Sequence, residues 1–326
     1  MIRLRIVVGL IAWAILGNAV AQQAQERNYP VKPIRLIVTF PPGGSADITA
    51  RALAARMSER LEQPVLIDNR PGAGGNIGLD IVAKSSPDGY TIGVGAAGAL
   101  AVNISLYPNM PFDPLKDFAP VGMVAMIPFV LVTHPSFAAA NLGEMLALAK
   151  ARPGTLSMGH GGNGTAMHLS AVLLKQMSGM DVALVPYKGS GPASTDVVAA
   201  QIPLAISDIP ASIAFIRSGR LKALGVTAGK RSAALPEVPT FAEAGISGYE
   251  SIGWFGVVAP AGTPEAIVNR LNAELQSALN DPEIRRRVIA SGAEPMPGTP
   301  AEFRSMIESE ILKWASVIKV SGARIE

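Results

Sequence analysis

The sequence predicts an α/β protein that is built from two sets of βαβ units. Short apolar runs alternate with glycine- and proline-rich turns and with helical segments from residue 33 onward, and this alternation is typical of parallel sheets covered by helices. The length of 326 residues and the hydrophobic content of 49% allow a large core and favour two domains over one. Because there is no cysteine, that core must stabilise the fold without disulfides.

The first residues have the pattern of a secretory signal. A basic start over residues 1–5 precedes an apolar run over 6–16, and Ala19-Val20-Ala21 supplies the small residues of a cleavage site. The apolar run is shorter than the roughly 20 residues that a membrane-spanning helix needs. We therefore expect an exported protein whose signal peptide, residues 1–21, is removed after Ala21.

The net charge of +3 is a poor guide to partners, because Arg3 and Arg5 belong to the predicted signal. Their removal lowers the number of lysines and arginines from 28 to 26, against 25 aspartates and glutamates. A nearly neutral surface and an aromatic share of 5% argue against nucleic-acid binding, which needs a clustered basic face and stacking platforms.

The first set of elements begins with a buried strand over residues 34–40. After Pro41-Pro42-Gly43-Gly44, apolar residues recur at helical spacing, which predicts a helix. The remaining elements of this set are a strand over 65–67, a glycine-rich turn over 69–75, a helix to about residue 84 and a strand over 90–94.

The second set begins near residue 125, where Pro128 interrupts two apolar runs and a strand restarts over 129–132. After Val226 the chain passes through a proline-rich stretch and returns to the first set. We therefore expect a discontinuous first lobe, residues 28–125 plus 228–326, and a second lobe over 126–227. The elements expected in the second lobe are strands over 156–158, 183–187 and 204–206, an apolar helix over 166–177 and a helix through 197–198.

The C-terminal third is predicted to be helical, with three identifiable starts. Thr263-Pro264, Asp281-Pro282 and Thr299-Pro300 each place a capping side chain before a proline at the first helical position. Glu302, three residues after Thr299, completes a capping box. In the last helix a broad apolar face is expected to pack in the core, and it consists of Phe303, Ile307, Ile311, Trp314 and Ile318.

The residues that point to function are glycine-rich loops that open helices. They lie over residues 43–47, 74–76, 161–165 and 188–191. A helix N-terminus has unpaired N–H groups and a partial positive charge, and small residues let an anion approach the backbone closely. In open parallel sheets such loops follow the carboxyl ends of strands, where ligands bind. The loops therefore predict a shared anion site, although each one alone could simply be a tight turn.

Two stretches match the Gly-x-Gly-x-x-Gly pattern of dinucleotide sites, over residues 93–98 and 159–164. That pattern needs an acidic residue at a strand end about 20 residues later. Asp117 lies in a proline-broken stretch after the first match, and Asp181 follows the second at a plausible distance. Because an exported protein rarely meets free nicotinamide cofactor, we predict no cofactor.

An enzymatic site is not predicted either. His134, His160 and His168 are the only histidines, none has zinc-motif spacing, and no Gly-x-Ser-x-Gly nucleophile elbow is present. Asp47 with His160 or His168 could form a dyad across the lobes. We instead interpret Asp47 as an anchor of the first loop and His168 as a satisfied core histidine. The sequence thus predicts no catalytic residue and no metal site, and an exported hydrolase of a small ester or phosphate is the alternative.

Five stretches of the chain resemble one family of proteins. It comprises the Bug-type (TctC-like) extracytoplasmic solute receptors of the tripartite tricarboxylate transporter family, and the likeness extends from about Tyr29 to the end. The resemblance implies a two-lobed fold of the periplasmic-binding-protein type (type II-like), with a βαβ sheet flanked by helices in each lobe and a ligand cleft at a hinge. It also implies a periplasmic location. The stretches lie over residues 40–47, 68–76, 185–193, 228–232 and 254–264.

The resemblance further implies a ligand and a partner. The ligand would be a small carboxylate (a di- or tricarboxylate, an acidic amino acid or an aromatic acid), held by backbone amides, hydroxyls and water, and the partner would be membrane transporter subunits. Where the family often has Phe-Asp-Asn, this chain has Ser207-Asp208-Ile209, so we expect a wider, less polar distal pocket. The expected ligand-binding residues are Phe40, Gly44, Ser45 and Asp47 in the first lobe, and Gly162, Asn163, Thr165, Tyr187 and Asp208 across the cleft.

Overall fold

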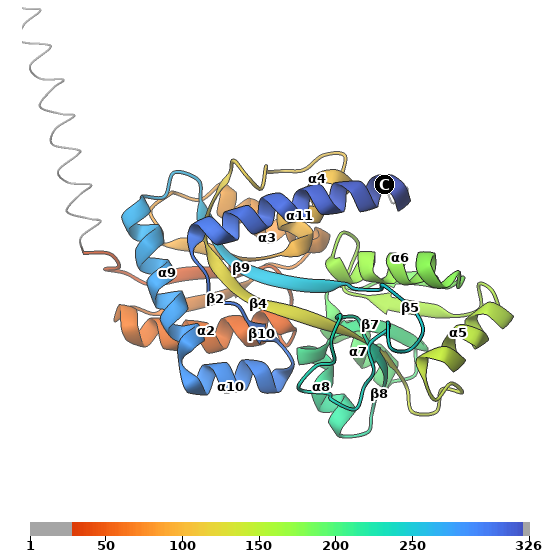
Figure 1. Cartoon of the computed structure of the whole chain (residues 1–326). Helices are drawn as coiled ribbons and strands as arrows, with labels where there is room; N and C mark the ends of the chain where they lie inside the picture. The colour runs from red at the N-terminus through yellow and green to blue at the C-terminus, as the bar shows by residue number, and fades with distance from the viewer. Residues whose placement is uncertain (1–27, 322–326) are drawn as a thin grey trace, which may run out of the picture.

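The computed structural model describes residues 28–321 and shows two α/β lobes joined by long strands. The predicted signal over residues 1–21 lies outside the described residues. In Figure 1 the first lobe lies on the left and the second on the right, with β4 (Phe118–Thr133) and β9 (Ile252–Pro260) between them. Within the described range, no helix is both long and apolar enough to cross a bilayer.

The first lobe contains the sheet order β2-β1-β3-β9-β4. The first three strands are parallel, as expected of βαβ units, whereas β9 runs antiparallel to both β3 and β4. The helix that follows each strand packs back on the sheet because its apolar positions recur at helical spacing. The elements are β1 (Ile34–Val38), α2 (Ser45–Leu61), β2 (Val65–Asn69), η1 (Ala73–Gly75), α3 (Asn76–Ala83), β3 (Thr91–Ala96), η2 (Gly98–Val102), α4 (Asn103–Leu106), α9 (Glu265–Asn280), α10 (Pro282–Ser291), β10 (Glu294–Pro295) and α11 (Pro300–Ser321).

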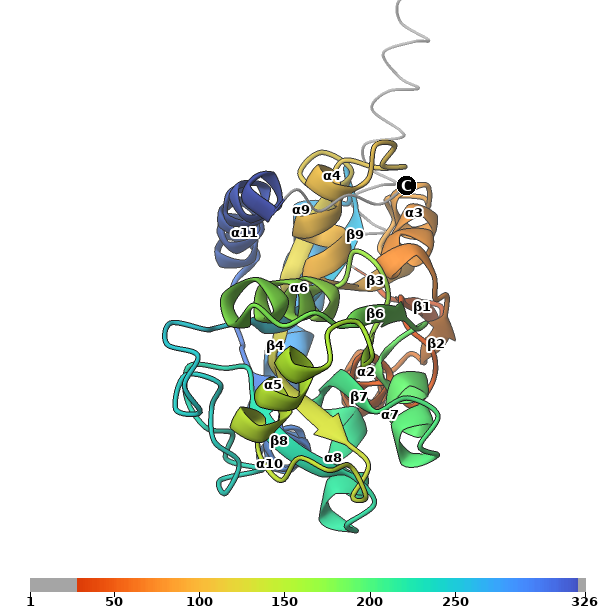
Figure 2. The same cartoon turned by 90° about the vertical axis from the view of Figure 1, so that its right-hand side faces the viewer.

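The second lobe continues the sheet in the order β4-β7-β5-β6, and β8 also pairs with β4. The pairs β5·β6 and β5·β7 are parallel, and β7 is antiparallel to β4. Figure 2, which views the molecule from the second-lobe side, shows α5, α6 and α7 in front of the shared strands. The elements are α5 (Leu142–Ala151), β5 (Ser157–His160), α6 (Ala166–Ser178), β6 (Ala183–Pro186), α7 (Ser190–Val198), β7 (Leu204–Asp208), α8 (Ile209–Arg217) and β8 (Lys222–Val226).

The expected interruption at Pro128 was wrong, because β4 is one strand that passes through this residue. Proline cannot donate a ladder hydrogen bond. Here it lies where the partner of β4 changes: Pro128 is opposite Ile252 of β9, and Phe129 is opposite Asp208 of β7. The amide of Phe129 donates to the Thr227 hydroxyl at 3.1 Å. The predicted lobe boundaries at 125/126 and 227/228 lie close to the point where β4 changes its partner strand, and they stay a prediction.

Two of the three predicted helix starts are confirmed. The Asp281 carboxylate accepts the amides of Glu283 and Ile284 at the start of α10. Thr299 and Glu302 form the capping box, with an amide-to-side-chain hydrogen bond in each direction at 2.7 and 3.2 Å.

The third start was wrong by one residue. Pro264 has extended rather than helical backbone angles and precedes α9, and the hydroxyl of Thr263 donates to the Pro260 carbonyl instead of capping the helix. The predicted apolar face of α11 is confirmed for Phe303, Ile307, Trp314 and Ile318, which are each at most 7% exposed, whereas Ile311 is only partly buried. This long helix packs on β4, η2 and α4 and so stabilises the first lobe.

Candidate ligand-binding site

A cavity lies between the two lobes, at the carboxyl ends of the parallel strands. Its walls come from the segments that follow β1, β2, β3, β5 and β6, from the end of β7 and from strands β4 and β9, which pass between the lobes. The cavity is narrow, about 40 Å³, which is room for about three water molecules. A larger guest therefore needs the lobes to separate or the lining side chains to rotate.

The first-lobe loop joins β1 to α2. Gly43 has φ +82°, a left-handed backbone that favours glycine, and this turns the chain sharply after Pro41-Pro42. Gly44 precedes α2 with extended backbone angles, and no side chain caps the helix. The first amides of α2, at Ser45 and Ala46, are consequently left available beside the cavity. Both residues line it and are at most 2% exposed.

Asp47 anchors this loop from within its own lobe. Its carboxylate accepts the amide of Gly43, the Nε of Arg51 and the side-chain amide of Asn69, each at 3.0 Å. Burial alone would raise the pKa of Asp47, but these hydrogen bonds outweigh it and hold the pKa below its usual range. Asp47 is therefore ionised and fully engaged, and it does not line the cavity.

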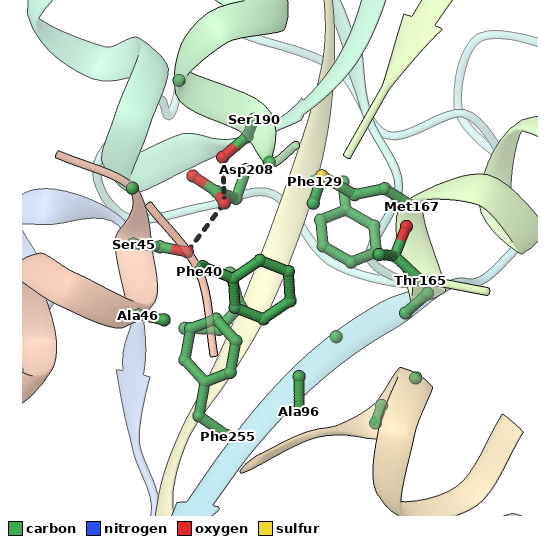
Figure 3. A pocket seen from close by; sticks show the side chains of 18 of the residues that line it. Phe40, Ser45, Ala46, Ala96, Phe129, Thr165, Met167, Ser190, Asp208 and Phe255 are labelled. Atoms are coloured by element: carbon green, nitrogen blue, oxygen red, sulfur yellow. Dashed lines mark hydrogen bonds between the residues drawn. The ribbon is translucent and has the colours of Figure 1, made fainter. Parts of the chain in front are cut away.

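Asp208 has a different environment on the opposite lobe. It ends β7 and caps α8, where its Oδ1 accepts the amide of Ala211 at 2.9 Å. Its Oδ2 accepts two hydroxyls, from Ser190 at 2.6 Å and from Ser45 at 2.7 Å (Figure 3). Burial raises the pKa of Asp208, and the bonds from Ser190, Ser45 and Ala211 offset this only in part.

The hydrogen bonds of Asp208 bring three helix N-termini together. Ser45 begins α2 of the first lobe, Ser190 begins α7 and Asp208 caps α8 of the second lobe. The positive ends of helix dipoles and their free amides stabilise negative charge without a cationic side chain. This arrangement is suited to an anion at the interface of the lobes.

Apolar side chains form the rest of the wall. Phe40 and Phe255 contact each other with ring centroids 6.3 Å apart, and Phe129 and Met167 face them from the other side of the cavity (Figure 3). Phe129, Met167 and Phe255 are at most 7% exposed. The site thus combines one polar end, at the helix N-termini, with an apolar body.

The lobes are in close contact beside the cavity. A Cβ atom on Gly98 would lie 2.5 Å from the carbonyl oxygen of Gly164, and one on Gly74 would lie 2.8 Å from that of Asn163. Tyr107 of the first lobe also donates to the Asn163 carbonyl at 3.3 Å. Only glycine permits this approach of backbone to backbone, so the structure represents a closed arrangement of the lobes.

A second, wider cavity of about 290 Å³ adjoins the first. It is lined mainly by the glycine-rich stretches 72–75 and 161–163 and by residues 186–188, and Phe40 lines both cavities. Tyr187 directs its hydroxyl to the Asp196 carboxylate at 2.7 Å, and burial and this carboxylate raise the pKa of the Tyr187 phenol to about 12. The exposed Lys188 supplies the cationic group at its edge.

The predicted binding residues are thus divided between two cavities. Phe40, Gly44, Ser45, Thr165 and Asp208 line the first one, whereas Gly162, Asn163 and Tyr187 line the second. Asp47 lies outside both linings. Whether each residue contacts a ligand stays a prediction.

Sequence reasoning missed several residues of the first cavity. Ser190 lies in a predicted loop, but nothing in the sequence brings it to Asp208. Phe129 and Met167 were interpreted as a strand residue and a helix-core residue. The departure at Ser207 and Ile209 does not reach the lining, because Ser207 bonds to Ser194 and Ser212 and Ile209 is buried in the second lobe's core.

The histidines do not form a dyad with Asp47. His160 and His168 stack on each other with ring centroids 4.7 Å apart, and burial together with His168 lowers the pKa of His160 to about 3. His168 accepts the Gly164 amide through Nδ1 at 3.4 Å, which agrees with a core role. Over residues 28–321, no three His, Cys, Asp or Glu side chains are grouped so that they could hold a metal ion.

Comparison with known proteins decides the family. Residues 49–323 match the family model described as tripartite tricarboxylate transporter family receptor. The chain belongs to this receptor family. It is 40% identical to the protein BugT of Bordetella pertussis over 100% of this chain and 99% of that protein. Members of the family bind solutes and are not enzymes, so the hydrolase alternative is set aside.

Two solved members of the family superpose closely on this receptor. A protein of R. palustris solved with adipate is 38% identical, with a TM-score of 0.88 over 91% of this chain and 100% of that chain. MatC from Rhodopseudomonas palustris with bound malate is 33% identical, with a TM-score of 0.85 over 89% and 100%. The predicted α/β periplasmic-binding-protein fold is therefore confirmed.

Proposed function

We propose that this receptor captures a small carboxylic acid between its two lobes in the periplasm and delivers it to a tripartite tricarboxylate-type membrane transporter. The observation that carries the proposal is the convergence of α2, α7 and α8, from both lobes, on one enclosed cavity. Adipate and malate, bound by the two R. palustris proteins, are both small carboxylic acids. A carboxylate is the anion best matched to main-chain amides and hydroxyls at helix ends.

Binding would act by shifting the population of lobe arrangements. A carboxylate that accepts the amides of Ser45 and Ala46 on one side and hydroxyls of the second lobe on the other bridges both lobes only when they are closed. Such a guest stabilises the closed form by the difference between its affinities for the two forms. For a micromolar ligand the total is about −8 kcal/mol, which a few charge-assisted hydrogen bonds and burial of the guest can supply.

The periplasmic location and the partners belong to the same proposal. The predicted signal over residues 1–21, cleaved after Ala21, would export the chain, and membrane subunits of the transporter would recognise its closed form. The hinge would lie where β4 and β9 pass from one lobe to the other. There the side chain of Thr227, which follows β8, donates to the carbonyl of Ser251, which precedes β9, at 2.7 Å. This hydrogen bond would hold the two segments together while the lobes move.

A thermal-shift panel of carboxylic acids on refolded, ligand-free protein tests this function. At a ligand concentration 100-fold above the dissociation constant, the free energy of unfolding should rise by about 2.7 kcal/mol, a shift of several degrees in Tm. Alcohols and amides of the same shapes serve as uncharged controls. A panel in which the amides stabilise the protein as well as the acids would contradict carboxylate recognition.

A further inference from the structure

The first cavity has an unusual charge composition. Among the described residues, Asp208 is the one ionisable side chain that lines it, and no lysine, arginine or histidine does. The positive character of the site therefore comes only from helix N-termini. One of these, that of α8, is already occupied by Asp208 itself through the Ala211 amide.

A second negative charge on a ligand would find no cationic side chain among the described residues of this lining. An ionised carboxylate can only accept hydrogen bonds, and both oxygens of Asp208 already accept them from within the protein, so Asp208 offers no donor to a ligand carboxylate. A second carboxylate would lose its water next to this acid, and burying a charge without a counter-charge is strongly unfavourable. The lining should therefore favour ligands with one negative charge over ligands with two, as well as anions over cations.

The remaining wall matches an apolar body. Phe40 and Phe255 stand on one side and Phe129 and Met167 on the other, and their side chains line the cavity beyond its Ser45 end (Figure 3). Aromatic rings gain most by packing on apolar or aromatic groups, and an unbranched methionine adapts to the shape of its neighbour. A hydroxylated chain such as that of a sugar acid would leave its hydroxyls unpaired against these rings.

We propose that the ligand is a monocarboxylic acid with an apolar or aromatic body, and that Phe129, Met167 and Phe255 determine this specificity. The inference rests on the proposed function and narrows its ligand class. The carboxylate faces the amides at the start of α2, and the body packs between the aromatic rings in place of a second charged group.

Isothermal titration with matched acids tests the inference. The pairs are hexanoate with adipate and benzoate with isophthalate, and malate and citrate extend the series to hydroxylated and more highly charged acids. We expect each monocarboxylate to bind at least about tenfold more tightly than its dicarboxylate partner. Tighter binding of adipate, isophthalate, malate or citrate overturns the inference and leaves the proposed function standing. Absence of binding by every acid in the series overturns both.

Two variants sharpen the result. Lys188→Ala alters only the exposed edge of the second cavity, and the affinity for the preferred monocarboxylate should stay within about twofold. A loss of tenfold or more would show that a ligand charge reaches the second cavity and would contradict the inference.

Met167→Lys adds a cation to the apolar wall and should raise the affinity for adipate relative to hexanoate at least tenfold, with Met167→Leu as the matched control. An unchanged ratio in a folded Met167→Lys protein would contradict the role of the wall.

Discussion

Asp47 and Asp208 both lie at the start of a helix, in opposite lobes, yet their surroundings differ. Asp47 has a cation, Arg51, and two amide donors, all from its own lobe. Asp208 has hydroxyls and one amide, with the Ser45 hydroxyl coming from the other lobe. The first acid therefore fixes a loop, and the second joins the lobes. The comparison shows that the partners of a carboxylate, rather than its place beside a helix N-terminus, decide what it does.

Replacing Ser45, the first-lobe partner of Asp208, should have the largest effect. Ser45→Pro removes both the amide proposed to bind the ligand and the hydroxyl that reaches Asp208. The backbone can accept it, because Gly44 is extended, as a residue before proline must be, and Ser45 is the first residue of α2. A hydrogen bond to a charged group contributes about 1.5–3 kcal/mol, so affinity should fall by about 10- to 150-fold in a calorimetric titration.

Ser45→Ala is the matched control for that substitution. It removes only the hydroxyl and keeps the amide, so its loss of affinity should be clearly smaller than that of Ser45→Pro. Equal losses would assign the effect to the link with Asp208 instead of to the amide. An unchanged affinity in a folded Ser45→Pro protein would remove α2 from the site.

Gly98→Ala tests lobe closure without touching either aspartate. The added methyl group would lie 2.5 Å from the Gly164 carbonyl oxygen, so it should oppose closure and lower the affinity about tenfold, since the competent arrangement becomes less populated. Because the contact is lost when the lobes open, Tm without ligand should change little. Small-angle scattering should show a more open molecule. Gly143→Ala, on the exposed face of α5, is the control and should behave like the parent.

The two aspartates should respond to pH with opposite sign. The raised pKa of Asp208 means that its ionisation costs stability as pH rises above the unfolded-state value, whereas the lowered pKa of Asp47 means that its contribution is present above that value and is lost as pH falls. Between about pH 2 and pH 7 the two variants should therefore differ in sign: Asp208→Asn should gain stability relative to the parent as pH rises above about 4, and Asp47→Asn should lose stability relative to the parent as pH rises toward about 4. Urea unfolding across this range measures both, and slopes of the same sign would contradict the assignment.

Arg51→Met should have the smallest effect. The Arg51 side chain is 54% exposed, whereas that of Asp47 is 4% exposed. Because water screens the guanidinium and Asp47 keeps its other donors, the contribution should stay near that of exposed ion pairs, about 0–1 kcal/mol. Stability should fall within that range, and ligand affinity should change less than twofold because the Gly43 and Asn69 bonds still hold Asp47. A large loss of affinity would mean that the loop depends on Arg51 far more than the exposed geometry indicates.

Local features of the sequence were sufficient for the fold and for part of the site. Glycine turns, apolar alternation and proline-marked helix starts act over a few residues, so they predict β1, α2 and the first-lobe loop directly. The meeting of Ser45 with Asp208 joins residues 163 positions apart, and no local pattern encodes it. Phe129 likewise had the pattern of an ordinary strand residue. It lies at the cavity because β4 passes from the first lobe to the second at this residue.

A crystal structure of the receptor with its tightest-binding acid tests the central claim most directly. We expect the carboxylate within hydrogen-bonding distance of the Ser45 or Ala46 amide, between the lobes, with the body of the acid against Phe129 and Phe255. A carboxylate bound in the second cavity, or one that contacts a single lobe only, would contradict the account.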